Sequence, residues 1–359
     1  MEFSNYFKES LSEFQNFFHD IRNNDLILFG ASGTGKDVLE KLKKNNIEVK
    51  FFCDNDPGKW HQKFCGITVI SPQELLRLKS ETVIVISSVF ITDIKRQLMP
   101  YFKTIYPYLL LETEFYDKNL IIKNEEYIKL FMSSLEDEKS YRIATNIIKH
   151  RLTGNHDYIS EIKEPEGTKN IYFEPEITHL DENEVFVDCG AYNGDTLLSF
   201  IKFSKNRFKN IYLFEPDLIN IGEINKIIQN KVLDERVKLI KKGVYSLNTK
   251  VNFEAEKGIA SAINNNGKFI IETCKLDDVF CSDRVTYVKM DIEGAEKEAL
   301  IGARNIIRRD KPKLAISIYH KPEDFWEIPK LIKLLVPEYK LYIRHYTDQL
   351  SETVCYAVC

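Results

Sequence analysis

An acidic glycine turn stands in the second half of the 359-residue sequence. Residues 185–196 read VFVDCGAYNGDT, a short apolar run followed by Asp188, Gly190, Gly194 and Asp195. The two glycines let the backbone pass close to a ligand. Two acids would repel a dinucleotide pyrophosphate, whereas S-adenosylmethionine has no phosphate and carries a cationic ammonium and sulfonium. The turn therefore favours S-adenosylmethionine over a dinucleotide.

A further acidic segment follows the next apolar run. The letters IYLF precede Glu215, Pro216 and Asp217. An acid at the end of the second strand of an α/β unit can accept both hydroxyls of a ribose. Two successive strands that end in the expected groups are a stronger signal than one glycine turn. A purely structural pair of turns is the alternative.

Other polar residues follow two later apolar runs. Asp291 and Glu293 come after VTYVKM, and His320 comes after LAISIY. Parallel strands deliver such residues to the carboxyl edge of a sheet, where α/β proteins bind ligands. The structural alternatives are acids that start a helix, where its dipole favours them, and a histidine of the core. His345, which also follows an apolar run, is a weaker candidate.

Another glycine turn lies near the N-terminus. Residues 30–37 read GASGTGKD and nearly match a phosphate-binding P-loop, but Asp37 stands where a hydroxyl should ligate Mg²⁺. Asp54 follows about 20 residues later, at the end of the second strand, where a dinucleotide fold places its ribose acid. We expect a nucleotide or nucleotide sugar here, with a ligand-free turn as the alternative. The residues that would hold it are Gly30, Gly33, Gly35 and Asp54.

Two sets of alternating strands and helices must position these residues. Apolar runs predict strands of the first set at residues 25–29, 48–52 and 82–86. Strands of the second set are predicted at residues 184–188, 210–214, 236–241, 285–290, 313–318, 339–343 and 353–358. The predicted helices of the second set lie near residues 196–204, 218–230, 295–308 and 324–335. This alternation indicates parallel βαβ units and an α/β fold.

The chain divides into four predicted regions. They are an N-terminal helix in residues 1–22, a small Rossmann-like domain in 23–113, a helical connector in 114–170 and a larger α/β domain in 171–359. The apolar stripe of the first helix consists of Phe3, Phe7, Leu11, Phe14, Phe18 and Ile21. We expect this helix to pack on its own domain, with dimerisation through it as the alternative.

Composition excludes several classes of protein. Hydrophobic residues make up 43% and charged residues 29%, as in an ordinary globular chain. A net charge of −4 gives no general reason to bind nucleic acid. No run of about 18 apolar residues predicts a membrane span, and the first residues lack the pattern of a signal peptide. The seven cysteines are scattered, so we expect reduced thiols in a cytoplasmic protein and no disulfide framework or structural zinc.

The larger domain resembles the FkbM family of methyltransferases. The resemblance rests on DCGAYNGDT at residues 188–196, FEPD at 214–217, LDD at 276–278, KMDIEGAE at 289–296 and LIGA at 300–303. It covers residues from about 172 to 359. It implies a class I, Rossmann-like methyltransferase with a seven-stranded sheet that uses S-adenosylmethionine and releases S-adenosylhomocysteine. It also implies O-methylation, often of a sugar or another natural-product hydroxyl.

The resemblance assigns roles to individual residues by position. The cofactor would be held by Asp188, Gly190, Ala191, Tyr192, Gly194, Asp195, Thr196, Glu215, Pro216, Asp217, Gly243 and Val244. Among these, Glu215 would hold the ribose, and Gly243 and Val244 would lie near the adenine. Asp291, Glu293 and His320 would face the acceptor.

The expected base for an acceptor hydroxyl is His320, because an unperturbed histidine has a pKa near ~6.5. Asp291 is the competing choice, either as the base or as a ligand of Mg²⁺. A required metal is not favoured, because hard oxygen ligands are only partly assembled in the sequence.

The first domain shows a separate resemblance. Residues 25 to about 90 resemble the Rossmann-like domain at the N-terminus of bacterial sugar acyltransferases, which binds a nucleotide sugar. The matching motifs are FGASGTG at residues 29–35, FCDND at 52–56 and GITVISP at 66–72.

The sequence therefore predicts a cytoplasmic bacterial O-methyltransferase of glycan biosynthesis. Its acceptor would be a sugar or glycan hydroxyl, free or nucleotide-linked, with no nucleic-acid or membrane partner. One alternative is a protein that binds a nucleotide sugar or glycan and only senses the cofactor. Another is an NAD-dependent oxidoreductase with two Rossmann domains. Assembly into a homo-oligomer stays open.

Overall fold

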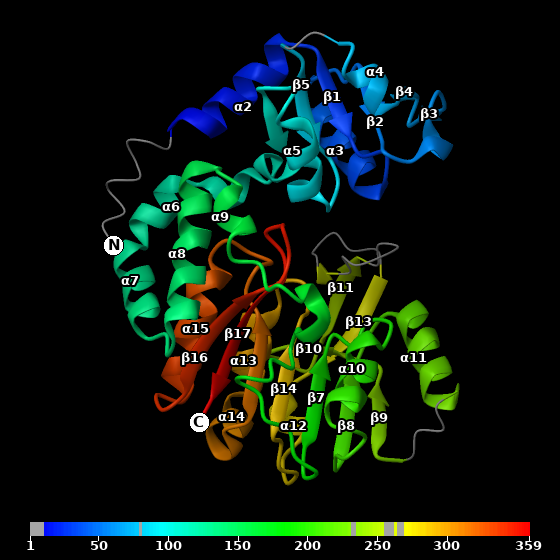
Figure 1. Ribbon diagram of the computed structural model, residues 1–359. Coiled ribbons are helices and arrows are strands. Elements are labelled where there is room, and N and C mark those ends of the chain that lie inside the picture. Colours follow the sequence, from blue (N-terminus) through cyan, green and yellow to red (C-terminus); the bar gives the residue numbers. More distant parts are fainter. Residues whose placement is uncertain (1–10, 79–80, 231–234, 255–261, 264–268) are drawn as a thin grey trace. The chain divides into compact units, whose positions relative to one another are not determined.

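The chain folds into two compact units (Figure 1). The computed structural model describes residues 11–78, 81–230, 235–254, 262–263 and 269–359. The first unit comprises Met1–Glu125, Ala144–Lys163 and Thr347–Leu350. The second unit comprises Glu126–Ile143, Glu164–Tyr346 and Ser351–Cys359. The chain therefore passes between the units more than once, and one passage falls inside helix α8 (Glu138–Thr153).

Over the described residues, the first unit is built on a six-stranded sheet in the order β3-β4-β2-β1-β5-β6. Neighbouring strands are parallel except β3 and β4. The strands are β1 Leu26–Phe29, β2 Phe51–Cys53, β3 Lys63–Phe64, β4 Ile67–Ile70, β5 Val83–Ile86 and β6 Ile105–Pro107. Its α-helices are α2 Leu11–Asn23, α3 Gly33–Lys44, α4 Pro72–Leu75, α5 Ile91–Leu98, α6 Lys118–Lys123 and α9 Asp157–Ser160.

Apolar side chains on both faces stabilise this sheet. Every residue of β1 and β5 is buried. Alternate side chains of β1 enter different hydrophobic clusters, Leu26 and Leu28 one of them and Ile27 and Phe29 the other. Because successive side chains of a strand point to opposite faces, the sheet is covered on both sides, as parallel sheets usually are.

Helix α2 packs against the first unit's own core. Phe17 and Ile21 are buried there, and Phe14 and Phe18 are partly buried beside them. Phe17 was not in the predicted apolar stripe, although it is fully buried. The stripe residues Phe3 and Phe7 lie outside the described residues.

The second unit contains a seven-stranded sheet, in the part of the chain that is described, with the order β16-β17-β15-β14-β7-β8-β9. Strand β17 is antiparallel to both of its neighbours, and the remaining neighbours are parallel. The strands are β7 Val185–Cys189, β8 Asn210–Phe214, β9 Val237–Ile240, β14 Tyr287–Met290, β15 Lys313–Ser317, β16 Lys340–His345 and β17 Thr353–Val358. All the strands predicted for this sheet are confirmed, and their ends differ from the predicted ones by at most two residues.

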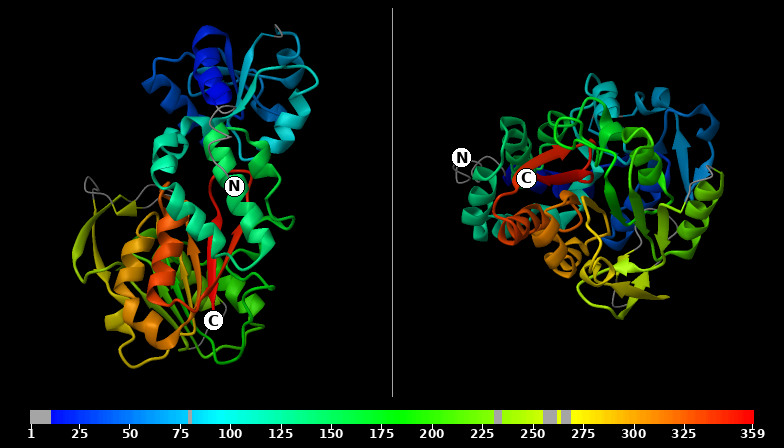
Figure 2. Two further views of the ribbon diagram at one scale, coloured as in Figure 1. Left: turned by 90° about the vertical axis from the view of Figure 1, so that its left-hand side faces the viewer. Right: turned by 90° about the horizontal axis from the view of Figure 1, so that it is seen from below.

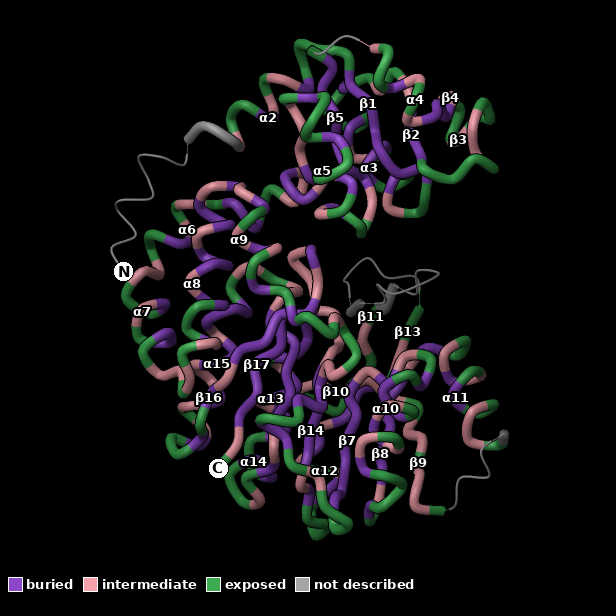
Figure 3. The backbone as a smooth tube through the Cα atoms, viewed as in Figure 1, coloured by how far each residue is buried: buried purple, intermediate pink, exposed green. Residues whose placement is uncertain are grey.

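Helices cover both faces of this sheet. On one face, Phe200 of α10 (Asp195–Phe203) stacks on Phe186 of β7 with ring centroids 4.4 Å apart. The orange helices α13 (Glu296–Gly302), α14 (Arg304–Asp310) and α15 (Asp324–Leu335) lie on the other side (Figure 2). The other helices of this unit are α7 Glu125–Ser133, α11 Leu218–Asn230 and α12 Leu276–Val279. The strands run through the buried interior between these layers (Figure 3).

A smaller sheet was not predicted from the sequence. It has the order β10-β13-β11-β12 and consists of β10 Gly243–Val244, β11 Lys250–Glu254, β12 Ala262–Ile263 and β13 Phe269–Cys274. The sequence of β13 has only three consecutive apolar residues, at positions 269–271, which is shorter than the run that marks a buried strand, and most of the strand is exposed or half-buried. The prediction of one continuous helix at residues 295–308 is also wrong, because this segment forms two shorter helices, α13 and α14.

The helical region predicted between the sheets contains α6, α7, α8 and α9. Within the described residues, no helix combines the length and the apolar character needed to cross a membrane.

Two glycines of the N-terminal turn should respond differently to alanine. A Cβ at Gly35 would lie 2.1 Å from the carbonyl oxygen of Gly30, whereas a Cβ at Gly33 would meet nothing within 4 Å. Gly35→Ala should therefore destabilise the chain by about 1–3 kcal/mol, the usual range for overpacking. Gly33→Ala lies at the start of α3 and should be neutral or stabilising by up to about 1 kcal/mol. Urea unfolding followed by circular dichroism measures both, and equal stabilities would contradict the packing argument.

Candidate functional site

A cleft of about 460 Å³ lies at the carboxyl ends of the central strands of the seven-stranded sheet. The segments after β7, β8 and β14 form much of its wall, and β10 contributes directly. Its lining includes Tyr172, Gly190, Tyr192, Asp195, Thr196, Glu215, Pro216, Gly243, Val244, Lys289, Asp291, Glu293 and Glu352. The fold thus brings these residues together from six separate stretches of sequence.

Most of the residues predicted to hold the cofactor line this cleft. Those that do are Gly190, Tyr192, Asp195, Thr196, Glu215, Pro216, Gly243 and Val244. Asp188, Ala191, Gly194 and Asp217 are not among its lining residues. Of the residues predicted to face the acceptor, Asp291 and Glu293 line the cleft and His320 does not.

The glycine turn after β7 is closely packed against its neighbours. Gly190 has φ +85°, and a Cβ there would lie 2.0 Å from the carbonyl oxygen of Asp291. Both Gly190 and Ala191 donate their backbone N–H to the carbonyl oxygen of Phe214, each at 3.1 Å. Only glycine fits this position, because a side chain would meet backbone and the left-handed φ would be strained. The turn is therefore held between the ends of β8 and β14.

A buried ion pair lies directly beneath this turn. Lys289 Nζ is 3.0 Å from Asp188 Oδ1 and donates a 2.7 Å hydrogen bond to the carbonyl oxygen of Gly190. Burial raises the pKa of Asp188 to about 6, although Lys289 opposes that rise. Burial alone would lower the pKa of Lys289, but Asp188 and Asp291 raise it above its ordinary value. Asp188 is thus the counter-ion of a buried lysine that itself lines the cleft.

Glu215 is fixed at the end of β8 by two backbone amides. Its Oε2 accepts from Tyr192 N and its Oε1 from Asp217 N, both at 2.8 Å. The residue is only 5% exposed. Burial raises its pKa to about 7, against the effect of these hydrogen bonds. Because a carboxylate has about four acceptor positions, Glu215 can accept further hydrogen bonds from a ligand in the cleft.

Two of the predicted residues outside the cleft lining shape the helices beside it. Asp217 Oδ1 accepts from Ile219 N at 2.7 Å and Asn220 N at 3.3 Å at the start of α11. Gly194, with φ +88°, precedes α10. Asp217 and Gly194 therefore fix the starts of α11 and α10 beside the cleft, although neither residue lines it.

Asp291 is held by two tyrosines. Tyr172 donates to its Oδ2 at 2.8 Å and Tyr319 to its Oδ1 at 3.1 Å. Burial would raise the pKa of Asp291, but the charges of Lys289 and His320 hold it below its ordinary value. The carboxylate is therefore ionised and fixed in orientation.

Two further acids share the cleft with Asp291. Burial raises the pKa of Glu293 and of Glu352 to about 7 each. Both residues have left-handed backbone conformations, with φ +54° for Glu293 and +62° for Glu352. Such conformations are strained for residues other than glycine and often occur at functional sites.

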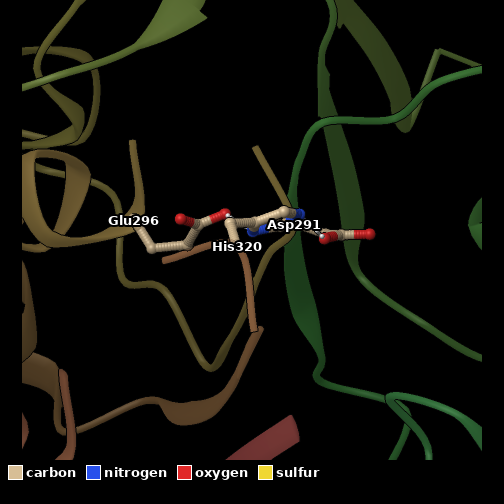
Figure 4. Close-up of side chains that lie close together, drawn as sticks. All are labelled: Asp291, Glu296 and His320. Carbon is tan, nitrogen blue, oxygen red and sulfur yellow. Dashed lines mark ion pairs between the residues drawn. The ribbon is translucent and has the colours of Figure 1, made fainter. Parts of the chain in front are cut away.

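His320 lies between the cleft acids and helix α13. Its Nε2 is 3.4 Å from Asp291 Oδ1 and 3.5 Å from Glu293 Oε2, and its Nδ1 is 2.9 Å from Glu296 Oε1. Figure 4 shows the imidazole placed between Asp291 and Glu296. Burial would lower the pKa of His320, but Glu296 and the two cleft acids raise it to about 10.

The structure also gathers residues that sequence reasoning missed. Lys289 and Glu352 line the cleft, and Tyr172 and Tyr319 hold Asp291. Lys289 could have been noticed as a charged residue inside an apolar strand. No sequence signal connects Glu352 with a site more than fifty positions away. His345 is fully buried, and its Nδ1 lies 2.8 Å from Thr353 Oγ1.

The N-terminal glycine turn has a similar local construction. Asp54 Oδ2 accepts from Ala31 N at 2.9 Å, and Asp54 Oδ1 accepts from Asp56 N at 2.9 Å. Lys59 Nζ also lies 3.0 Å from Asp54 Oδ2. Gly30 and Gly35 pack against backbone atoms, whereas the space around Gly33 is open. Each of these contacts is internal to the unit, so nucleotide binding at this turn stays a prediction.

Two family models match separate parts of the chain. Residues 188–349 match the model described as methyltransferase FkbM domain, which confirms the resemblance seen in the motifs of this region. Residues 22–103 match the model described as C2185-like, N-terminal. The expected likeness of this region to sugar acyltransferases stays a prediction. No curated protein matches the chain significantly.

Comparison with solved structures finds one that matches nearly the whole chain. A methyltransferase FkbM from Methylobacillus flagellatus KT is 22% identical, with a TM-score of 0.83 over 99% of this chain and 98% of that one. An rRNA methylase from Streptococcus thermophilus has a TM-score of 0.32 at 14% identity over 56% of this chain and 91% of that one. Aeropyrum pernix fibrillarin with bound S-adenosyl-L-methionine has a TM-score of 0.32 at 11% identity, covering 53% and 71%. The first match shows that this chain has the fold of a class I methyltransferase of the FkbM type.

The buried ion pair gives a stability prediction. Asp188→Asn would leave the ammonium of Lys289 buried without the carboxylate that lies 3.0 Å from it, which should destabilise the chain by about 3–5 kcal/mol. Adding Lys289→Met removes the second charge and should restore a large part of that loss. The measurement is urea unfolding.

The control is the exposed pair Glu223–Lys226, whose loss in Glu223→Gln should change stability by at most about 1 kcal/mol. An Asp188→Asn chain as stable as the parent would show that the ion pair does not stabilise the fold.

Proposed function

We propose that this chain is an S-adenosylmethionine-dependent methyltransferase that methylates a hydroxyl of a sugar or glycan. The observation that carries the proposal is Glu215, a buried carboxylate that faces the cleft at the end of β8. The match of residues 188–349 to the methyltransferase FkbM domain supports it.

The cleft fits the parts of this cofactor. Each carboxylate oxygen of Glu215 accepts one backbone N–H, which leaves acceptor positions for the two ribose hydroxyls. The turn with Gly190, Tyr192 and Asp195 would surround the methionine end, where acids are compatible with its ammonium and sulfonium. Val244 would lie against the adenine.

Three further acids of the lining suit a hydroxylated acceptor. Asp291, Glu293 and Glu352 all line the cleft and can accept hydrogen bonds from hydroxyl groups. Such a set favours a polyhydroxyl acceptor over a phosphorylated group at this point, because phosphate would be repelled.

Methyl transfer forms an oxygen–carbon bond as the sulfur–carbon bond of the cofactor breaks, and the acceptor oxygen loses its proton. Alignment of the hydroxyl supplies much of the rate. A residue that removes the proton contributes about 10²–10⁴-fold more. His320, the base expected from the sequence, lies behind the cleft acids, so we propose that a carboxylate lining the cleft receives this proton.

A substitution at Glu215 tests the cofactor assignment. Glu215→Gln keeps the shape but removes the charge that would hold the ribose hydroxyls, so S-adenosylhomocysteine should bind about 10–100-fold more weakly. Calorimetric titration measures this affinity.

Glu223→Gln, an exposed acid of α11, is the matched control and should leave the affinity unchanged. Failure of the parent chain to bind S-adenosylhomocysteine would refute the proposal, and binding of NADH in its place would favour an oxidoreductase.

The raised pKa of Glu215 predicts a pH dependence. Ribose hydroxyls donate more strongly to the ionised carboxylate, which forms as the pH rises through the value of about 7. The affinity for S-adenosylhomocysteine should therefore increase between about pH 6 and pH 8. The Glu215→Gln chain should not show this increase, and the same slope in both chains would mean that another group titrates.

A further inference from the structure

The imidazole ring of His320 has carboxylates on both sides. Its Nδ1 lies 2.9 Å from Glu296 Oε1, and its Nε2 lies 3.4 Å from Asp291 Oδ1 and 3.5 Å from Glu293 Oε2. A neutral imidazole carries a proton on one nitrogen and a lone pair on the other, whereas an imidazolium carries a proton on each. In the neutral form one nitrogen would direct its lone pair at a carboxylate. The geometry therefore favours the charged ring.

The surrounding acids outweigh the cost of burying this charge. The side chain of His320 is only 8% exposed, and burial alone would lower its pKa. Glu296, Asp291 and Glu293 oppose that effect and raise the pKa to about 10. The acids that interact with the ring come from several elements, namely Glu296 of α13, Asp291 and Glu293 after β14, Asp324 of α15 and Glu352 before β17.

The lysines nearby are engaged elsewhere. Lys289 pairs with Asp188, and Lys321 donates to the carbonyl oxygen of Gly294. His320 is thus the positive group that lies directly between the acids of the cleft and Glu296.

Glu296 fixes the ring from the side of α13. It is fully buried, and its Oε1 also accepts from Ile292 N at 2.8 Å. Figure 4 shows the ring beside this carboxylate. The segment after His320 is held as well, because the ammonium of Lys321 donates to the carbonyl oxygen of Gly294 in the turn after β14. The ring therefore cannot move away from the acids without loss of several contacts.

The two acids on the Nε2 side of the ring line the cleft. Asp291 is also held by two tyrosines, whereas the side chain of Glu293 is 28% exposed. Glu293 lies in a left-handed part of the backbone, with φ +54°. Attraction by a charged ring would restrict the positions that its carboxylate can adopt.

We propose that His320 is a positioning residue, whose imidazolium ring keeps the carboxylates of Asp291 and Glu293 ionised and in place at the wall of the cleft. This role rests on the proposed function, because these acids would accept hydrogen bonds from the acceptor hydroxyl. An imidazolium has no free lone pair, so His320 does not take the proton of that hydroxyl. The role differs from that of the base expected from the sequence.

The charge of His320 can be measured without an acceptor. Histidine labelled with ¹³C at Cε1 is incorporated into the full chain, and the signal that is missing from His320→Gln identifies His320. A histidine in water loses its proton near pH ~6.5, so a neutral ring would be evident by about pH 8. We expect the signal of His320 to keep the position of an imidazolium up to about pH 8.

Glu296→Gln tests the ion pair on the Nδ1 side of the ring. Loss of this carboxylate should increase the acid dissociation constant of His320 at least about 10-fold, because an opposite charge nearby favours the charged form. Glu323→Gln, which changes an exposed acid close to His320 in sequence, is the control and should leave that constant unchanged. If circular dichroism shows that Glu296→Gln does not fold, Glu293→Gln at its partly exposed position makes the same comparison.

A measurement at Glu293 separates positioning from packing. With glutamate labelled with ¹³C at Cδ, the signal that is missing from Glu293→Gln identifies Glu293, whose pKa in the parent is about 7. His320→Gln removes the charge and keeps a polar side chain, so Glu293 should ionise at higher pH, with an acid dissociation constant at least about 10-fold smaller. A histidine that only fills space would leave this titration unchanged.

A neutral His320 at about pH 8 overturns the proposal, and so does a titration of Glu293 that is the same in the parent and in His320→Gln. Titration of the parent with S-adenosylhomocysteine tests the proposed function separately. Binding of this ligand beside a neutral His320 refutes only the positioning role, whereas absence of binding beside a charged His320 refutes only the methyltransferase.

Discussion

The cleft depends on one buried ammonium group. Lys289 reaches Asp188 at the end of β7, the carbonyl oxygen of Gly190 in the glycine turn and the ring of Tyr172, whose centroid is 5.0 Å away. Removing two charges from water costs several kcal/mol for each ion, so the pair persists only because its partners are well placed. This interaction links two adjacent strands and the turn between β7 and α10, and so sets the wall of the cleft.

The other acids of the site are fixed by different means, and this separates their properties. Backbone amides hold Glu215, tyrosine hydroxyls hold Asp291, and Glu293 has a strained backbone and a more exposed side chain. Neighbouring positive charges keep the pKa of Asp291 low, whereas burial raises that of Glu215 to about 7. One cleft therefore contains carboxyl groups that differ in their pKa values and in how firmly they are held.

The two units show how similar local sequence leads to different sites. Asp54 and Glu215 each accept backbone hydrogen bonds from a glycine turn and from the residue two positions later. In the first unit, however, Lys59 pairs with Asp54. An acid already paired with a lysine has less capacity for a ribose than one that faces a cleft. The shared motif therefore specifies the turn, and the surrounding side chains decide what the acid can bind.

Sequence by itself determined the α/β class, every strand of the seven-stranded sheet and the acids at the strand ends, because buried strands require apolar runs and the chain must turn where those runs stop. It missed the small sheet, whose strands are short and partly exposed. Only the tertiary structure decided that Asp188 serves Lys289, that Glu352 joins the cleft and that His320 lies behind two acids. Strand order brings these residues together across long stretches of chain, and periodicity reports only which way each residue faces within its own element.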